Sequence, residues 1–264
     1  MGIERFNEQW LAQRLAGRIP TLRVMDCVDS TNSEAKRYAL SGGEAPCAFL
    51  AETQSGGRGR MGRSFFSPDG TGIYLSLLLH PKETLADTVL LTTAAAVGAC
   101  RAIRRVTGLS PAIKWVNDLY LDGKKVCGIL AESFFAEERR MIVLGVGVNL
   151  YTRDFPPELA EIATGLMPKK GLRNELAAAL IEELMTLWED LTPEAFLEEY
   201  RRDSMVLGQA VTYTENGISC SGIAESIDEG GRLTVRRGDG SAAVLAGGEI
   251  SLRLNPNKLT GELS

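Results

Sequence analysis

The sequence contains very little of the chemistry that metal sites and nucleophilic catalysis use. Among its 264 residues there is one histidine, His80, in an apolar, strand-like run. The five cysteines form no C-x-x-C pair; they are Cys27, Cys47, Cys100, Cys127 and Cys220. A zinc site, a disulfide framework and a Ser/His or Cys/His catalytic arrangement are therefore disfavoured. Scattered thiols fit a reducing compartment, so we expect a cytoplasmic protein.

Long apolar runs are also missing. No stretch approaches the length of a membrane span, and the first twenty residues are amphipathic, without the apolar core of a signal peptide. The net charge is −5, from 29 basic and 34 acidic residues, which argues against a general nucleic-acid binder. With 44% hydrophobic residues, the chain can bury a sizeable core.

The expected strands and helices alternate without a regular β–α–β rhythm, so we predict an α+β fold with a mixed sheet. The clearest helices are expected over residues 84–106 and 172–191, where apolar residues recur at helical spacing. From about residue 207 short β-rich runs are separated by glycine-containing turns, which is typical of a small barrel of about five strands. We therefore predict two domains, residues 1–206 and 207–264.

Residues 53–67, TQSGGRGRMGRSFFS, combine three arginines with four glycines. Like charges on a flexible segment oppose its ordering, and a polyanionic ligand would remove both costs. Arginine forks match phosphate oxygens, and glycines let backbone N–H groups approach them. The P-loop pattern is absent, and although Gly57-x-Gly59-x-x-Gly62 formally matches a dinucleotide fingerprint, no helix is expected after it. The alternative is a solvated loop that binds nothing.

Two lysines flank a hairpin that we predict to turn at Asp122-Gly123: Lys114 in KWVND and Lys125 in KKVCGIL. A lysine in an apolar strand either reaches an anion or extends its amine to solvent, and both readings stay open. Asn117 and Asp118 either belong to a site or form a simple turn.

Two further stretches have both a structural and a functional reading. Residues 145–150, GVGVNL, place glycines on one face of a strand, where a ligand or another backbone could approach, and leave Asn149 at the strand end. Residues 29–32, DSTN, form a helix N-cap pattern, and a helix N-terminus also offers N–H groups to a polar ligand.

Together these segments resemble the biotin–protein ligases. The matching stretches follow the family's order over roughly residues 20–254: DSTN, AETQSGGRGRMGRSFFS, KWVNDLYL, KKVCGILAE, GVGVNL and GGEISLR. The arginine loop followed by KWxND is highly specific as a pair. The resemblance implies a mixed-sheet catalytic domain of the biotin/lipoate ligase type, followed by a small SH3-like β-barrel. About twenty residues precede the first expected strand, too few for the DNA-binding winged helix of bifunctional members, so the chain resembles the short form.

The resemblance implies a two-step reaction that uses ATP, biotin and Mg²⁺ bound with the nucleotide. The biotin carboxylate first attacks the α-phosphate of ATP, which gives biotinyl-5′-AMP and pyrophosphate. A lysine amine of a biotin carboxyl carrier domain then attacks the mixed anhydride, and AMP leaves. No enzyme nucleophile is needed, so catalysis would rest on positioning and charge stabilisation.

The same resemblance implies roles for residues of this sequence. The expected catalytic residues are Lys125, Arg60 and Asp118. The expected biotin-binding residues are Ser30, Thr31, Asn32, Gln54, Gly57, Arg58, Lys125 and Gly128. The expected nucleotide-binding residues are Arg58, Arg60, Arg63, Phe65, Lys114, Asn117 and Asn149. Whether the protein itself holds a metal is left open.

Three positions depart from the family pattern: Val116 replaces a usual proline, Phe65 a common tryptophan, and Cys127 a small apolar residue, which we expect only to pack. The rival readings are a lipoate–protein ligase, a non-catalytic nucleotide-binding regulator and a DNA-binding repressor. The pairing of the arginine loop with KWxND argues against a lipoate–protein ligase. The presence of both Lys125 and the arginine loop argues against a non-catalytic regulator. The net charge argues against a DNA-binding repressor. We expect no DNA or membrane partner and leave a homodimer open.

Overall fold

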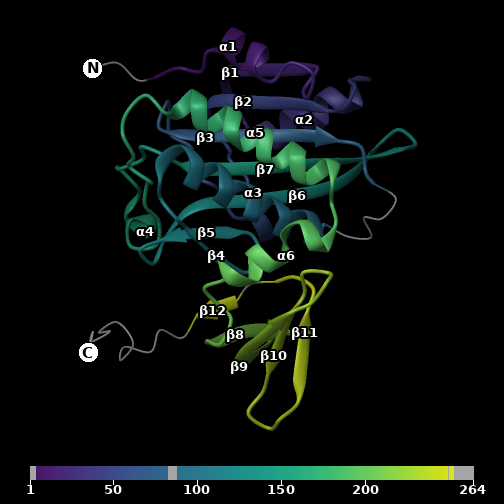
Figure 1. Cartoon of the computed structure of the whole chain (residues 1–264), viewed down its shortest axis with the longest axis vertical. Helices are drawn as coiled ribbons and strands as arrows, with labels where there is room; N and C mark the ends of the chain where they lie inside the picture. The colour runs from purple at the N-terminus through teal and green to yellow at the C-terminus, as the bar shows by residue number, and fades with distance from the viewer. Residues whose placement is uncertain (1–3, 83–87, 249, 253–264) are drawn as a thin grey trace.

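The computed structural model describes residues 4–82, 88–248 and 250–252 (Figure 1). The helices are α1 (Glu8–Arg14), α2 (Thr31–Leu40), α3 (Val89–Thr107), α4 (Pro157–Ala160), α5 (Arg173–Glu189) and α6 (Pro193–Arg202). The strands of the first sheet are β1 (Thr21–Val28), β2 (Cys47–Gln54), β3 (Gly72–Leu79), β4 (Ala112–Lys114), β5 (Asp118–Leu121), β6 (Lys124–Ala136) and β7 (Arg139–Asn149). Those of the second sheet are β8 (Ala210–Glu215), β9 (Ile218–Ile227), β10 (Leu233–Arg236), β11 (Ala242–Leu245) and β12 (Ile250–Leu252).

The first sheet has seven strands in the order β1-β2-β3-β7-β6-β5-β4. Only β1 and β2 run parallel; the other neighbours are antiparallel. The predicted α+β class with a mixed sheet is therefore confirmed. The β5–β6 turn falls at Asp122 and Gly123 as predicted, with φ of 49° and 77°.

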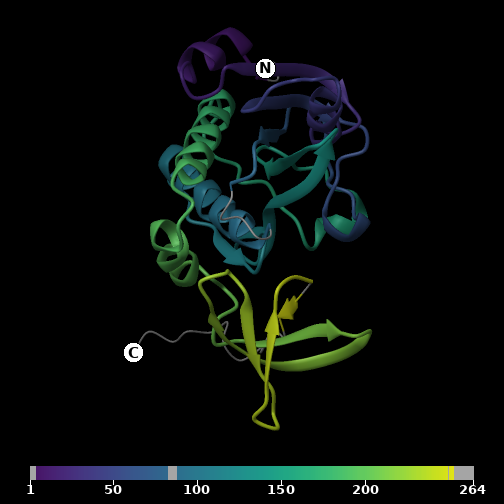
Figure 2. The same ribbon diagram turned by 90° about the vertical axis from the view of Figure 1, so that its right-hand side faces the viewer.

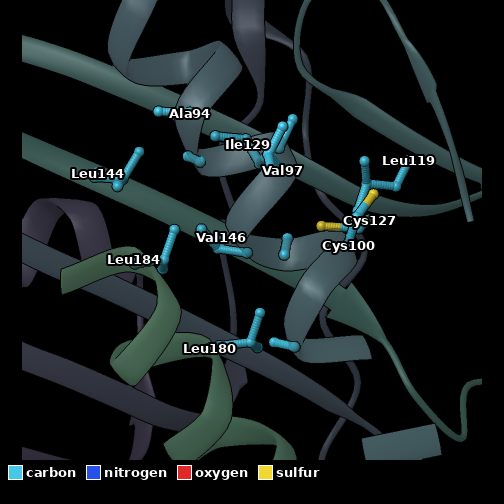
Figure 3. Packing of buried hydrophobic residues seen from close by; sticks show 14 of the residues in the cluster. Ala94, Val97, Cys100, Leu119, Cys127, Ile129, Leu144, Val146, Leu180 and Leu184 are labelled. Carbon is cyan, nitrogen blue, oxygen red and sulfur yellow. The ribbon is translucent and has the colours of Figure 1, made fainter. Parts of the chain in front are cut away.

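Helices cover both faces of this sheet. On one face α3 and α5 pack against each other and against β6, β7 and β3, as the side view shows (Figure 2). Figure 3 shows Val97 of α3 beside Ile129 and Val146, with Leu184 of α5 close by. The two helices approach closely at Gly98, which has no side chain: a Cβ at this position would lie only 3.3 Å from a Leu187 methyl group. On the other face α2 packs with a smaller core that includes Phe49 and Leu78.

Local patterns explain where several helices begin. Asn7 caps α1 by accepting a 3.0 Å hydrogen bond from the Trp10 amide. At α2, Ser30 occupies the N-cap position but its side chain makes no capping bond; instead its amide donates to Asp29 Oδ1 at 2.8 Å. The long helix expected from residue 84 begins at Val89 in the structure, and residues 83–87 lie outside the described ranges. None of the helices in these ranges is long and apolar enough to cross a membrane.

The C-terminal strands form a five-stranded antiparallel sheet in the order β11-β10-β9-β8-β12, beside β4 and α6 (Figure 1). Within the described residues its edge strands β11 and β12 do not pair, so the prediction of a closed barrel is not confirmed. The sheet is attached to the first one by a buried contact: Trp115 Nε1 donates to the Gly231 carbonyl at 2.9 Å. That contact holds the turn after β4 against the turn between β9 and β10.

Candidate active site

A cavity of about 310 Å³ opens on the face of the first sheet opposite α3 and α5. Its wall is contributed by the start of α2, the arginine loop (residues 53–67), strands β5 to β7, the segment 151–171 and the start of β12. All but one of the predicted site residues line it: Ser30, Thr31, Asn32, Gln54, Arg58, Arg60, Arg63, Phe65, Lys114, Asn117, Asp118, Lys125, Gly128 and Asn149. The structure thus gathers into one cavity residues that are spread over half of the sequence.

Gly57 is the exception and does not line the cavity. A Cβ at Gly57 would collide with the Phe65 carbonyl oxygen and lie 2.7 Å from Ser67 Oγ. Its amide region is therefore packed against the returning half of the same loop. The close packing at Gly57 therefore shapes the loop and leaves no room for a side chain at this position.

Glycines form the floor of the cavity. In β7, Leu144, Val146 and Val148 point to the α3 layer, so Gly145 and Gly147 present backbone to the opposite face. A Cβ at Gly147 would lie 2.6 Å from the Phe65 ring, and one at Gly145 would collide with Asn32 Oδ1. The alternating glycines therefore make room for an aromatic ring and an amide that line the site.

One end of the cavity is a buried network of uncharged polar groups. Gln54 Oε1 accepts from the Thr31 amide at 2.8 Å and from the Thr31 hydroxyl at 3.1 Å. The Ser76 hydroxyl lies 2.8 Å from Thr31 Oγ1 and 2.6 Å from Asn32 Oδ1. Gln54 Nε2 donates to Ser67 Oγ at 2.8 Å. These groups suit a neutral ligand that both donates and accepts hydrogen bonds.

The arginine loop is ordered by its own backbone and by protein partners. The Gly59 amide donates to the Arg63 carbonyl at 2.7 Å, and the Phe65 amide donates to the Gly57 carbonyl at 2.8 Å. Arg60 Nη1 donates to Asn117 Oδ1 at 3.1 Å and to the Gly248 carbonyl at 3.2 Å. The loop is thus held by contacts within the protein, and its expected binding of a polyanion stays a prediction.

The Lys125 amine contacts an anionic group, which is the first of the two interpretations that the sequence left open. Its Nζ lies 2.7 Å from Asp118 Oδ1, and the two side chains are 30% and 20% exposed. The two groups form an ion pair, and no other described residue offers a hydrogen-bond donor to this buried oxygen. Lys114 lies nearby with its Nζ 5.3 Å from the centre of the Tyr120 ring. A positive and a negative group are thus both available in the middle of the cavity.

Asn149 ends β7 at the far side of the cavity. Its side chain is buried, and its Oδ1 has no hydrogen-bond partner among the described residues. A buried acceptor without a donor costs free energy, so this oxygen is suited to a ligand N–H group or a cation. No cluster of three or more His, Cys, Asp or Glu side chains within the described ranges could hold a metal.

The wall opposite the arginines is apolar and was not predicted. Phe155, Leu159, Ile162 and Ala163 line the cavity from the segment 151–171, and the Phe155 and Phe66 rings lie 5.8 Å apart. The segment is attached to β6 by a 2.9 Å hydrogen bond from the Lys125 amide to Ile162. Its sequence has no glycine-rich motif to identify it; apolar residues are scattered among charged ones in a proline-containing stretch directly after Asn149.

The C-terminal sheet contributes to the same cavity through Gly248, Ile250 and Ser251. Glu249 and Arg253, which matched the terminal GGEISLR segment, lie outside the described residues. The contact of Arg60 with Gly248 joins the arginine loop to this sheet.

Comparison with known proteins assigns the whole arrangement to one family. Residues 24–149 match the biotin/lipoate A/B protein ligase family, and residues 206–253 match the biotin protein ligase C terminal domain. The biotin–[acetyl-CoA-carboxylase] ligase of Mycobacterium tuberculosis is 30% identical over 262 residues, which covers 94% of this chain and 96% of that protein. The chain belongs to the biotin protein ligase family. The predicted family resemblance is thereby confirmed.

Two other relatives show how far the similarity extends. The bifunctional ligase/repressor BirA of Bacillus subtilis is 36% identical over 167 residues, or 62% of this chain and 51% of that protein. The chain thus spans about half the length of this relative. The biotin protein ligase from Aquifex aeolicus, solved in complex with biotin and ATP, is 26% identical with a TM-score of 0.76, over 89% of this chain and 99% of that one.

The three departures from the biotin protein ligase pattern are each accommodated by packing. The Val116 carbonyl accepts from the Tyr200 hydroxyl at 3.1 Å, and the Trp115–Val116 peptide bond is cis. Phe65 packs edge-to-face against Tyr74, with ring centres 6.5 Å apart. Cys127 is fully buried, and burial raises the pKa of its thiol well above the usual value. It therefore packs as an apolar residue, as expected.

Proposed function

We propose that this protein uses ATP to activate biotin as biotinyl-5′-AMP and transfers the biotinyl group to a lysine of a biotin carboxyl carrier domain. One observation carries the proposal: a single cavity joins a buried network of neutral hydrogen-bonding groups to a cluster of arginines and lysines. A neutral ureido ring and a charged acyl phosphate are the two ends of biotinyl-AMP. The family membership supports the same reading.

The ureido ring would bind at the end formed by Ser30, Thr31 and Gln54. All three side chains line the cavity, and Thr31 with Gln54 already supplies both donors and acceptors. Gly128 and Gly147 make room at the sheet for Lys125 and for the Phe65 ring, which would face the ligand. The bound carboxylate would then point to the cationic half of the cavity.

In the first step a biotin carboxylate oxygen forms a bond to the α-phosphorus, and the bond from that phosphorus to the pyrophosphate oxygen breaks. Negative charge gathers on the phosphate oxygens during this exchange. Lys125 would leave Asp118 for these oxygens, and Arg58 and Arg60 would hold them from the loop side. Fixed cations in a partly buried site stabilise such a transition state without further reorganisation. Arg63 and Lys114 would contact the departing pyrophosphate.

The nucleotide would lie between Phe65 and the apolar wall of Phe155 and Ile162. Asn149 Oδ1 is an acceptor, so it would bind an adenine or ribose donor, or a cation, and not a phosphate oxygen. Asn117 orients Arg60 by accepting its hydrogen bond. Mg²⁺ bound with ATP would neutralise phosphate charge, and Asn149 Oδ1, together with the Asp118 carboxylate once Lys125 has turned to the phosphate, fits the oxygen ligands that it prefers.

In the second step the carrier lysine amine attacks the acyl carbon, the amide bond forms and the bond to the AMP oxygen breaks. Asp118 would accept a hydrogen bond from the attacking amine once Lys125 has turned to the phosphate. No covalent enzyme intermediate is needed. The partner is therefore a carrier domain that can present one extended lysine to the mouth of the cavity.

We also infer the finer organisation of the chain. A division near residue 206 is supported by the start of the C-terminal family match, and an SH3-like barrel by the order and shortness of β8 to β12. A homodimer is supported by the open side of β1, which pairs only with β2 in the described residues. The net charge of −5 argues against a DNA partner, and free thiols together with ATP use favour the cytoplasm.

The test is ATP–pyrophosphate exchange by the purified protein with Mg²⁺, run with biotin, with lipoate and with neither acid. Exchange that requires biotin is the expected result. Exchange with lipoate in its place would refute the proposed substrate. No exchange with either acid from a folded sample would favour a binding protein that regulates without catalysis.

A further inference from the structure

We propose that Glu132 is a positioning residue for biotin activation, which orients Arg58 and Asn32 at the cavity without touching the ligand. The inference rests on the proposed function and gives a role to the last residue of the KKVCGILAE stretch, which was not among the expected site residues and does not line the cavity. Glu132 lies on β6, two residues after Leu130 on the same face of the strand. Among the described residues, Leu130 lines the cavity and Glu132 does not.

Three groups from two other elements converge on this one carboxylate. Lys36 Nζ of α2 lies 2.8 Å from Oε1, and Arg58 Nη2 of the arginine loop lies 3.1 Å from the same oxygen. Asn32 Nδ2, at the start of α2, donates to Oε2 at 2.9 Å. Glu132 therefore ties the arginine loop and α2 to β6 at one point, directly behind two residues of the cavity wall.

The carboxylate also fixes which way the Asn32 amide points. A carboxylate only accepts hydrogen bonds, so the Asn32 NH₂ group faces Glu132 and Oδ1 faces the Ser76 hydroxyl at 2.6 Å. Ser76 in turn contacts Thr31 Oγ1 at 2.8 Å. The orientation set by Glu132 is thus passed along hydrogen bonds to the residues proposed to hold the ureido ring.

The charges around Glu132 leave Arg58 able to attract an anion. Burial raises the pKa of the Glu132 carboxyl, but hydrogen bonds from Lys36 and Asn32 and the charges of Lys36 and Arg58 outweigh it, so the pKa lies below its usual range. The group is therefore ionised at neutral pH. One carboxylate faces two cations, so a net positive charge remains at the edge of the cavity.

A purely structural role for the ion pair is disfavoured by exposure. The Arg58 side chain is 45% exposed, and ion pairs of half-exposed arginines add little to stability. The same side chain lines the cavity from the arginine loop, and its ion pair with Glu132 joins it to β6. We therefore infer that the ion pair with Glu132 serves to hold the Arg58 guanidinium in one position at the cavity.

The experiment compares Glu132→Gln with the wild-type protein in biotin-dependent ATP–pyrophosphate exchange and in release of biotinyl-AMP from the loaded enzyme. Gln keeps the size but replaces one acceptor oxygen with a donor. We expect the KM for biotin to rise about tenfold and adenylate release to accelerate similarly, because hydrogen bonds to charged groups are lost. The kcat should also fall, by about threefold, because Arg58 is then less well oriented toward the phosphate oxygens whereas Lys125 and Arg60 are untouched. Glu132→Asp should recover part of the loss.

Glu199→Gln is the matched control. Glu199 pairs with Arg101 between α6 and α3, the two side chains are 30% and 26% exposed, and neither lines the cavity. This variant should keep wild-type KM and release rate. Thermal unfolding of each variant shows whether a sample is folded before its kinetics are read.

A double-mutant cycle tests the route of the effect. If Glu132 acts through Arg58, Glu132→Gln should change the KM for biotin less in an Arg58→Ala background than in the wild type. An unchanged KM and release rate in folded Glu132→Gln, or a full-sized effect in the Arg58→Ala background, would overturn the inference. Absence of exchange by the wild-type protein would instead overturn the proposed function, so the two failures are distinguishable.

Discussion

Replacing Lys125 with alanine separates catalysis from folding most sharply. The Lys125 amine is the cation nearest to Asp118 in the middle of the cavity, at 2.7 Å, and it would neutralise charge at the α-phosphate. Loss of one preorganised group that stabilises transition-state charge costs about 100- to 1,000-fold in rate, or ~3–4 kcal/mol. The ion pair itself is partly exposed, at 30% and 20%, so its loss should cost less than about 1 kcal/mol of stability.

The assay is biotin-dependent ATP–pyrophosphate exchange at saturating substrates, with thermal unfolding measured on the same samples. Lys124→Ala is the matched control, because Lys124 is the neighbouring residue on β6, does not line the cavity, and donates to the Ala160 carbonyl at 2.9 Å. The control should stay close to the wild-type rate. A folded Lys125→Ala variant that exchanges within about threefold of the wild type would refute the role of Lys125, since one preorganised charge should contribute far more.

Three further variants test other parts of the site and the fold. Arg60→Ala removes the hydrogen bonds to Asn117 and Gly248 and should release biotinyl-AMP about tenfold faster; unchanged retention in a filter-binding assay would count against loop closure. Phe155→Ala should raise the KM for ATP roughly fivefold, with the KM for biotin unaltered, because an aromatic contact contributes about 1 kcal/mol; an equal rise in both constants would contradict a nucleotide-specific wall. Arg173→Ala removes the buried cation from Glu52, which keeps the Phe6 amide at 2.7 Å and the more exposed Arg5 at 3.7 Å, and should lower the free energy of unfolding by about 3–5 kcal/mol in urea titration; a loss under about 1 kcal/mol would show that Arg5 or solvent compensates the charge of Glu52.

The sequence predicted elements better than it predicted their arrangement. The helix expected over residues 172–191 matches α5 (Arg173–Glu189), because apolar spacing of three and four residues acts locally. The central place of β7 between β3 and β6 was not predictable, since it depends on pairing between segments that are distant in the chain. Closure of the C-terminal sheet depends in the same way on β11 meeting β12, and turn spacing contains no information on that contact.

The site was predictable where residue types are unusual for their surroundings. Arginines among glycines and a lysine in an apolar strand are unusual, and this predicted that Lys125 and the arginines of the loop belong to a site. Both line the cavity. Phe155 and Ile162 were missed because apolar residues in a loop are ordinary core candidates until the fold places them. Ser76 carried a usable signal, as the one serine inside the apolar run of β3. Alternation within β3 would have put it on the α2 face.

Two of the three arginines of the loop, Arg58 and Arg60, contact groups of the protein itself. Arg58 has Glu132, Arg60 has an amide oxygen and a carbonyl oxygen, and the backbone of the loop closes on itself between Gly59 and Arg63. A phosphate that enters the cavity therefore exchanges partners with groups that are already placed and does not have to order a free chain. Because ordering costs are largely met in advance, binding energy remains available for the transition state. The loop's arginines should accordingly influence the rate of activation and the retention of the adenylate more than the stability of the fold.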